Sequence, residues 1–123
     1  MRLKELLEFV DGIKPNAYAE IQKTKWVNDC EGMVQTQVFL LAPEEITGYG
    51  WPEDEDAELL VSPPHDKLYL SYLYAMIDFA NGEYGKYQNS MQMFNAEFSE
   101  FMRWFANMYR PADTNLEKED GRW

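Results

Sequence analysis

Few side chains in this sequence have the type and spacing that catalysis needs. The chain has one histidine, His65, which follows Pro64 at an expected helix start, and one cysteine, Cys30, on an apolar helical stripe. A lone histidine at a helix start is typically a surface or capping residue, and a cysteine on such a stripe is typically an inert core residue. The sequence has neither a G-x-S-x-G turn nor a phosphate-binding G-x-x-x-x-G-K-[ST] loop. We therefore expect no catalytic residue, no cofactor and no enzymatic activity.

Four consecutive carboxylates, Glu53, Asp54, Glu55 and Asp56, form the segment best suited to a hard cation such as Ca²⁺, which takes oxygen ligands. The run lacks the ligand spacing and the glycine of an EF-hand loop. We therefore favour a solvated acidic loop and predict no metal site. A metal-dependent enzyme built on these carboxylates stays open as an alternative, which flat calorimetric titrations with calcium, magnesium and manganese would exclude.

Length and charge narrow the function classes further. The chain has 123 residues, which fits one domain, with 22 acidic and 11 basic side chains and a net charge of −11. This charge argues against a protein that binds nucleic acid by neutralising phosphates. No apolar run approaches the roughly 20 residues that span a bilayer, so we expect no membrane contact.

The apolar spacing predicts a mainly α-helical fold, a small bundle of about four helices. They are expected over residues 3–13, about 19–40, about 64–80 and 84–110. The second carries an apolar face of Ile21, Trp26, Val27, Cys30, Met33, Val34, Val38 and Leu41. The fourth alternates apolar steps of three and four over more than three heptads: Tyr84, Tyr87, Met91, Phe94, Phe98, Phe101, Phe105 and Met108. This stripe is interpreted as a core seam, with the alternative that part of it faces another subunit.

Two segments lie outside this helical pattern. Residues 42–64 form a long acidic loop between the second and third helices, within which residues 59–61 are expected to be extended and pinned to the core. Residues 112–123 form a polar, flexible C-terminal tail after a helical domain of residues 1–111. The tail is either a frayed terminus or a segment that orders on a partner, with Leu116 and Trp123 as anchors.

Several segments together resemble a known family over roughly residues 3–111. They read LKELLEFVDGIKPNAY, IQKTKWVNDCEG, ELLVSPPHDKLY, IDFANGEYGKYQNSMQMFN and RWFANMYRP. The pattern is similar to head–tail connector (adaptor, or head-completion) proteins of tailed phages and prophages of Gram-positive bacteria. The resemblance implies a virion protein of the neck, present in the host cytoplasm during assembly, that forms a ring below the portal and extends the DNA channel.

The resemblance also implies partners. They are the portal protein, neighbouring copies in a twelve-fold ring, a stopper or tail-completion protein, and genomic DNA that passes without specific binding. The C-terminal tail would dock onto the portal, which makes Leu116, Arg122 and Trp123 candidate portal-binding residues. The acidic run, Glu53 to Asp56, would face the channel, a neighbour or the next neck protein.

A small acidic inhibitor of phage origin that mimics DNA is the alternative function, since a charge of −11 on 123 residues can imitate phosphates. Against it, the acids do not form a regular stripe, because eight of the 22 lie between Glu44 and Asp66. A connector and an inhibitor differ in a simple respect. The connector assembles with itself or a portal, whereas the inhibitor competes with DNA for a protein.

Overall fold

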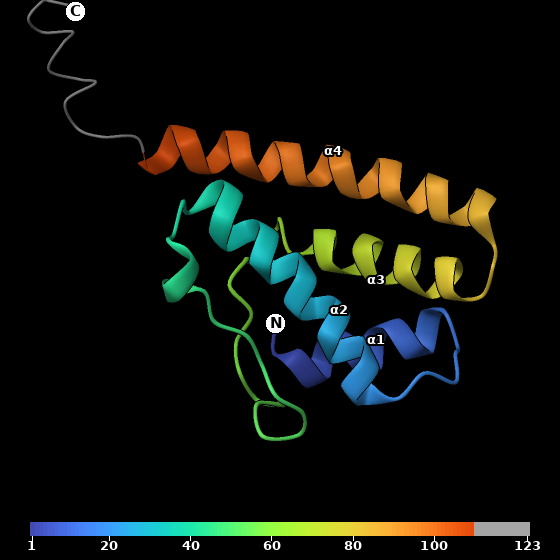
Figure 1. Ribbon diagram of the computed structural model, residues 1–123. Helices are drawn as coiled ribbons and strands as arrows, with labels where there is room; N and C mark the ends of the chain where they lie inside the picture. The colour runs from blue at the N-terminus through green and yellow to red at the C-terminus, as the bar shows by residue number, and fades with distance from the viewer. Residues whose placement is uncertain (110–123) are drawn as a thin grey trace, which may run out of the picture.

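The computed structural model describes residues 1–109. The predicted tail, residues 112–123, lies outside this range. Within it the chain forms four α-helices and no β-strand (Figure 1). The helices are α1 (Leu3–Ile13), α2 (Glu20–Met33), α3 (Lys67–Ala80) and α4 (Tyr84–Tyr109), with a π-helical segment η1 (Val34–Val38) and a 3₁₀ turn η2 (Pro43–Glu45). The small, mainly helical bundle predicted from the sequence is confirmed.

The α3–α4 hairpin forms the most extensive helix–helix contact of the fold. The two helices are antiparallel and lie side by side (Figure 1). Gly82 joins them with φ of +79°, a left-handed conformation that suits glycine and ends a helix. Tyr72 of α3 packs on Phe94 of α4 with ring centroids 5.1 Å apart. Phe98 and Phe101 continue this buried seam along α4.

The buried seam covers only the middle of the α4 stripe. Tyr84 and Met108, at its two ends, are 58% and 61% exposed. At the Met108 end the reason is length: α4 has 26 residues and α3 has 14, so at 1.5 Å per residue α4 is about 39 Å long against about 21 Å and extends beyond the start of α3. The interpretation of the whole stripe as core is therefore wrong at both ends.

The second layer packs α1 and α2 against the hairpin. Leu3, Leu6, Leu7 and Val10 of α1 are fully buried, and Val27, Cys30, Val34 and Val38 continue the core along α2 and η1. The helix predicted over residues 19–40 is confirmed in extent, since η1 continues α2 to Val38. Ile21 is a correction, because its side chain is 57% exposed. The neighbouring Lys23 is buried instead, held by Asp11 of α1 with Nζ–Oδ1 at 2.7 Å.

Residues 59–61 connect the long loop to the core. Leu59 and Val61 are buried and Leu60 is exposed, the alternation of an extended chain. The backbone NH of Leu59 donates to the carbonyl of Met1 at 2.9 Å, next to an isolated antiparallel bridge between Arg2 and Glu58. The expected extended segment is thus pinned beside the start of α1.

Candidate functional site

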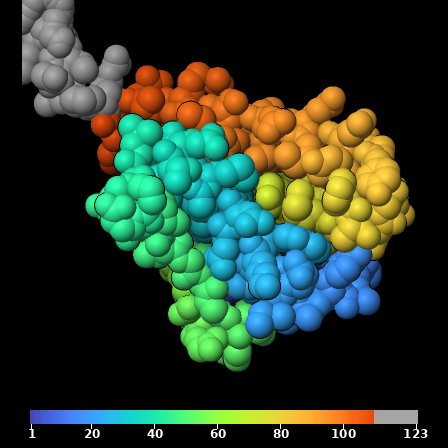
Figure 2. All heavy atoms as spheres, viewed as in Figure 1, coloured from blue at the N-terminus to red at the C-terminus, as the bar shows by residue number. Residues whose placement is uncertain are grey.

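The long loop is fixed to one polar face of α2 and η1. The Asn28 side-chain amide donates to the carbonyl of Tyr49 at 2.9 Å and accepts from its NH at 2.8 Å. Gln35, seven residues on, makes the same pair with Thr47, at 2.8 and 3.0 Å. Seven residues are two helical turns, so both amides lie on one face. Figure 2 shows the loop packed against the side of this helix.

Glu31 lies between these two amides and is buried. Its carboxylate accepts from the hydroxyl of Tyr49 at 2.7 Å, the hydroxyl of Tyr69 at 2.7 Å and the backbone NH of Leu60 at 3.0 Å. Tyr69 in turn accepts from the NH of Val61 at 2.9 Å. Burial, together with the charge of Glu31, raises the pKa of Tyr69 well above its ordinary value. The network joins α2, α3 and the loop.

The acidic run does not gather into a cation site. Asp56 lies 3.4 Å from the guanidinium of Arg2 and 3.2 Å from Nζ of Lys4, and Asp54 accepts from the NH of Gly50 at 2.7 Å. The loop also caps α1, since the NH groups of Leu3 and Lys4 donate to loop carbonyls at 2.9 Å. Among residues 1–109 there is no cluster of three or more His, Cys, Asp or Glu that could hold a metal ion.

The two residues considered for catalysis occupy structural positions. Cys30 is buried in the core, and burial raises the pKa of its thiol well above the ordinary value, as does the charge of Glu31. The His65 ring packs against two aromatic rings of α4, with centroids 5.5 Å from Phe101 and 5.0 Å from Trp104. The placement of Cys30 in the core, as predicted from its stripe, is confirmed.

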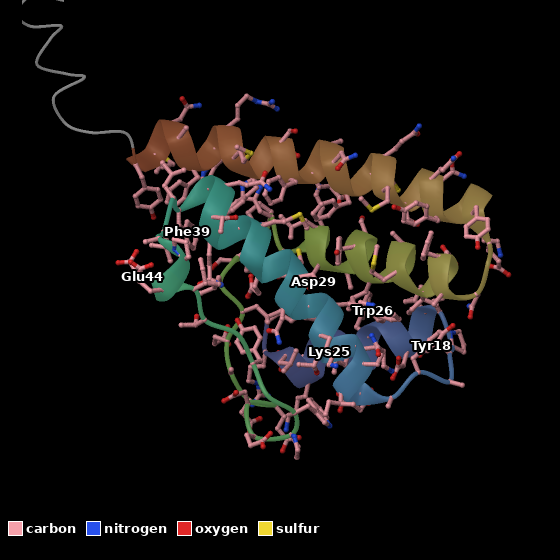
Figure 3. The ribbon with its side chains drawn as sticks, in the orientation of Figure 1. Tyr18, Lys25, Trp26, Asp29, Phe39 and Glu44 are labelled. Carbon is pink, nitrogen blue, oxygen red and sulfur yellow. The ribbon has the colours of Figure 1, made fainter. Side chains whose placement is uncertain are left out.

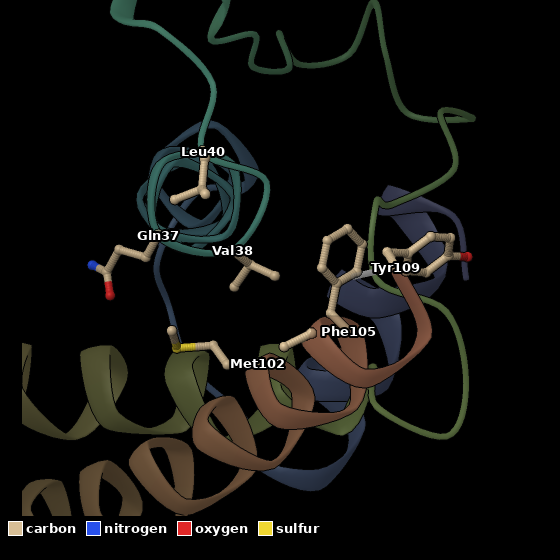
Figure 4. A pocket seen from close by; sticks show the side chains of 7 residues that line it. Gln37, Val38, Leu40, Met102, Phe105 and Tyr109 are labelled. Atoms are coloured by element: carbon tan, nitrogen blue, oxygen red, sulfur yellow. The ribbon is translucent and has the colours of Figure 1, made fainter. Parts of the chain in front are cut away.

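The C-terminal end of α4 carries the feature that the sequence patterns missed, a largely apolar surface. We call it the α4-end surface. Its exposed members are Leu40, Leu60, Met102, Trp104, Met108 and Tyr109. Two hollows open on it, one of about 340 Å³ between η1 and α4 and one of about 190 Å³ beside Leu60 and Trp104 (Figure 4). Phe105 and Tyr109 line both hollows.

Phe39 and Leu40 show how this surface is built. Phe39 turns toward α4 (Figure 3), where its ring centroid is 5.0 Å from that of Phe105. Leu40 has φ of +58°, and the following NH, of Leu41, donates to the carbonyl of Gln35 at 2.9 Å. This is the helix-ending geometry in which glycine is the usual residue. A leucine that is 78% exposed occupies it at the rim of the larger hollow.

Large apolar side chains are also exposed on the elements that meet at the other end of the bundle, where α1 and α3 end and α4 begins (Figure 1). We call this region the hairpin-end surface, and its exposed members are Phe9, Ile13, Phe79 and Tyr84. Polar contacts hold this end together, with Lys14 Nζ 2.9 Å from Asp78 and the Tyr18 hydroxyl donating to Asn81 at 2.7 Å. The two surfaces differ in residues and shape and stand about the length of α4 apart.

The sequence contained two signals for the α4-end surface. Trp104 and Tyr109 are aromatic residues off the heptad seam of α4, and Phe39-Leu40-Leu41 is an apolar run that continues past a helix end. The candidate portal-binding residues Leu116, Arg122 and Trp123 lie outside the described residues. Over residues 1–109 no helix has the length and apolar character to cross a membrane.

No family model matches the sequence, and the comparisons with curated proteins and with solved structures find no match either. The resemblance to head–tail connectors stays a prediction.

Proposed function

We propose that this protein is a structural component of a tailed-phage virion. In this proposal it is a head–tail connector (adaptor) that forms a ring below the portal, extends the DNA channel and gives a platform to the stopper or tail. It acts in the neck of the virion and is made in the host cytoplasm. Its role is assembly rather than catalysis.

The observation that carries the proposal is the pair of unlike apolar surfaces at opposite ends of α4. A cyclic ring with more than two members is built from heterologous contacts, in which one face of each protomer meets a different face of its neighbour. The α4-end surface has hollows, and the hairpin-end surface offers the exposed side chains of Phe9 and Phe79. Large exposed apolar patches mark interaction sites, and aromatic residues and Met are enriched in interfaces.

The acidic balance supports a channel role. Glu44, Glu53 and Asp56 are exposed on the loop, and Glu44 points away from the bundle (Figure 3). The hydrogen bonds to Asn28 and Gln35 hold this loop in one place. Carboxylates on a channel wall repel DNA phosphates over roughly 8 Å at physiological salt, so that DNA passes without sticking. The loop faces the channel, a neighbouring copy or the next neck protein.

The tail contributes the portal contact in this proposal, through Leu116, Arg122 and Trp123. Its support is composition and the family resemblance: two large apolar anchors in a polar segment suit a chain that orders on a partner. The neighbouring copies, about twelve in the ring, would then be held both to one another and to the portal.

Mass photometry of the protein alone and mixed with its phage's portal ring tests the proposal. We expect a large complex with many copies per portal, and its loss when residues 112–123 are deleted. Trp104→Glu should weaken the ring by placing a charge in the α4-end surface, whereas Gln88→Glu, on an exposed polar part of α4, should leave it unchanged. A protein that stays monomeric and ignores the portal contradicts the proposal. Competition with DNA for a nuclease would then favour the inhibitor.

A further inference from the structure

The larger hollow of the α4-end surface has an apolar lining and an open mouth, and the chain continues beyond it. We infer that this hollow, between η1 and α4, is the docking site of the chain's own C-terminal segment, with the Leu116 side chain as the anchor. The occupant is thus residues 112–123 of the same molecule. The inference needs no portal, no ring and no other protein.

The first support is the character of the hollow. It measures about 340 Å³, and Val38, Leu40, Met102 and Phe105 supply most of its wall (Figure 4). Gln37 is the polar side chain at its edge. Water in such a space finds few hydrogen-bond partners, so that an apolar side chain entering it is favoured. The volume suits a side chain of leucine size or larger.

The second support is where the described chain ends. Tyr109 lines the hollow and is the last described residue of α4, and fourteen residues follow it. Leu116 is seven residues farther on, which allows a span of about 23 Å when extended. The hollow reaches along α4 only from Met102 to Tyr109, about 10 Å at 1.5 Å per residue. Pro111 disfavours continuation of the helix, so the chain can turn back.

The third support is the composition of the segment. Residues 112–123 contain two large apolar side chains, Leu116 and Trp123, and the residues on either side of Leu116 are Asn115 and Glu117. A single apolar anchor between polar neighbours can enter an apolar hollow while its neighbours stay in water. A short tether also gives millimolar effective concentration, which favours the chain's own segment over that of a neighbour.

A consequence follows for assembly, and this step alone rests on the proposed function. The segment that docks in the hollow is also the segment proposed to bind the portal. Both contacts use Leu116, so they compete. In the free protein the tail would occupy the hollow and cover part of the α4-end surface. Portal binding would draw the tail out and expose the hollow to a neighbouring copy, which places ring formation after portal contact.

The test uses methyl NMR of the full chain labelled at its methionines. Met102 lines the hollow, and Met93 is an exposed residue of α4 outside it. We expect deletion of residues 112–123 to move the Met102 methyl resonance and to leave that of Met93 in place. A peptide of residues 112–123, added to the truncated protein, should restore the original Met102 position. The same peptide with Leu116→Ser should bind at least about tenfold more weakly, since it loses the burial of one leucine.

A filled hollow provides the matched control. Ala106 lines the hollow, so Ala106→Trp should abolish peptide binding, whereas Gln88→Trp, on another exposed part of α4, should not change it. Circular dichroism confirms that each variant keeps its helices. Identical Met102 resonances in the full and truncated chains overturn the inference. A Met102 shift that is lost on dilution also overturns it, because the occupant would then come from a neighbouring molecule.

Discussion

The hydroxyl of Tyr69 donates to Oε1 of Glu31 at 2.7 Å, and both side chains are buried. This contact joins the last turn of α2 to the first turn of α3. The same hydroxyl accepts from the NH of Val61, so one oxygen serves three segments of the chain. A buried carboxylate is tolerated here because three donors compensate for its lost hydration.

Tyr69→Phe should lower the free energy of unfolding by about 1–3 kcal/mol, because it leaves Oε1 of Glu31 and the NH of Val61 without partners. Urea denaturation at pH 7 measures the change. Tyr74→Phe is the control, since Tyr74 is only partly buried and its hydroxyl has no hydrogen bond within the described chain; its change should stay within about 0.5 kcal/mol. Equal losses in the two variants would mean that the network contributes nothing specific.

The raised pKa of Tyr72 should make the free energy of unfolding fall at alkaline pH. Burial, with the charge of Asp29, raises its pKa to about 12. The unfolded chain ionises this phenol near pH 10, so the folded form holds the proton more strongly. Its contribution is therefore full below about pH 10 and is lost as pH rises toward 12. Tyr72→Phe should flatten the fall in unfolding free energy between these pH values, as urea titrations would show. An unchanged slope would exclude Tyr72 as a cause.

Phe98→Ala should destabilise the protein by about 3–5 kcal/mol, because the ring is buried at the middle of the α3–α4 seam and packs 5.5 Å from Phe94. Met93→Ala, on the exposed side of the same helix, should cost less than about 1 kcal/mol. Thermal unfolding of both variants provides the comparison. A loss below about 1 kcal/mol for Phe98→Ala would place this ring outside the core.

The helices could be predicted from the sequence because apolar spacing reports which face of a helix is buried. The same pattern placed Ile21 in the core and overlooked Lys23, since periodicity does not show that Asp11 pairs with the lysine from another helix. The roles of Asn28 and Gln35 were equally hidden, because their partners are backbone groups of a distant loop. Contacts between segments far apart in sequence leave no local spacing to detect.

Loss of the hydrogen bonds from the Gln35 side-chain amide should make the acidic loop more mobile. Gln35→Ala removes both hydrogen bonds to the backbone of Thr47, so amide hydrogen exchange at residues 45–49 should become at least about tenfold faster, while the helices stay protected. Gln37→Ala is the control, because Gln37 is exposed and lies on a different face of η1. Exchange that is as slow in the Gln35 variant as in the control would show that the loop is held by other contacts.

Substitutions of Leu40 should affect the stability of the fold and the assembly of the ring differently. Its positive φ is strained for leucine and natural for glycine, and its exposed side chain contributes little burial. Leu40→Gly should therefore leave the free energy of unfolding unchanged or raise it by up to about 1 kcal/mol. The thermal midpoint should stay the same or rise accordingly. Under the proposed function the same change removes an apolar side chain from the α4-end surface, so the ring on the portal should weaken. Leu40→Asn, which also tolerates this conformation, should behave alike. A less stable variant that assembles normally would mean that Leu40 serves the fold and not the interface.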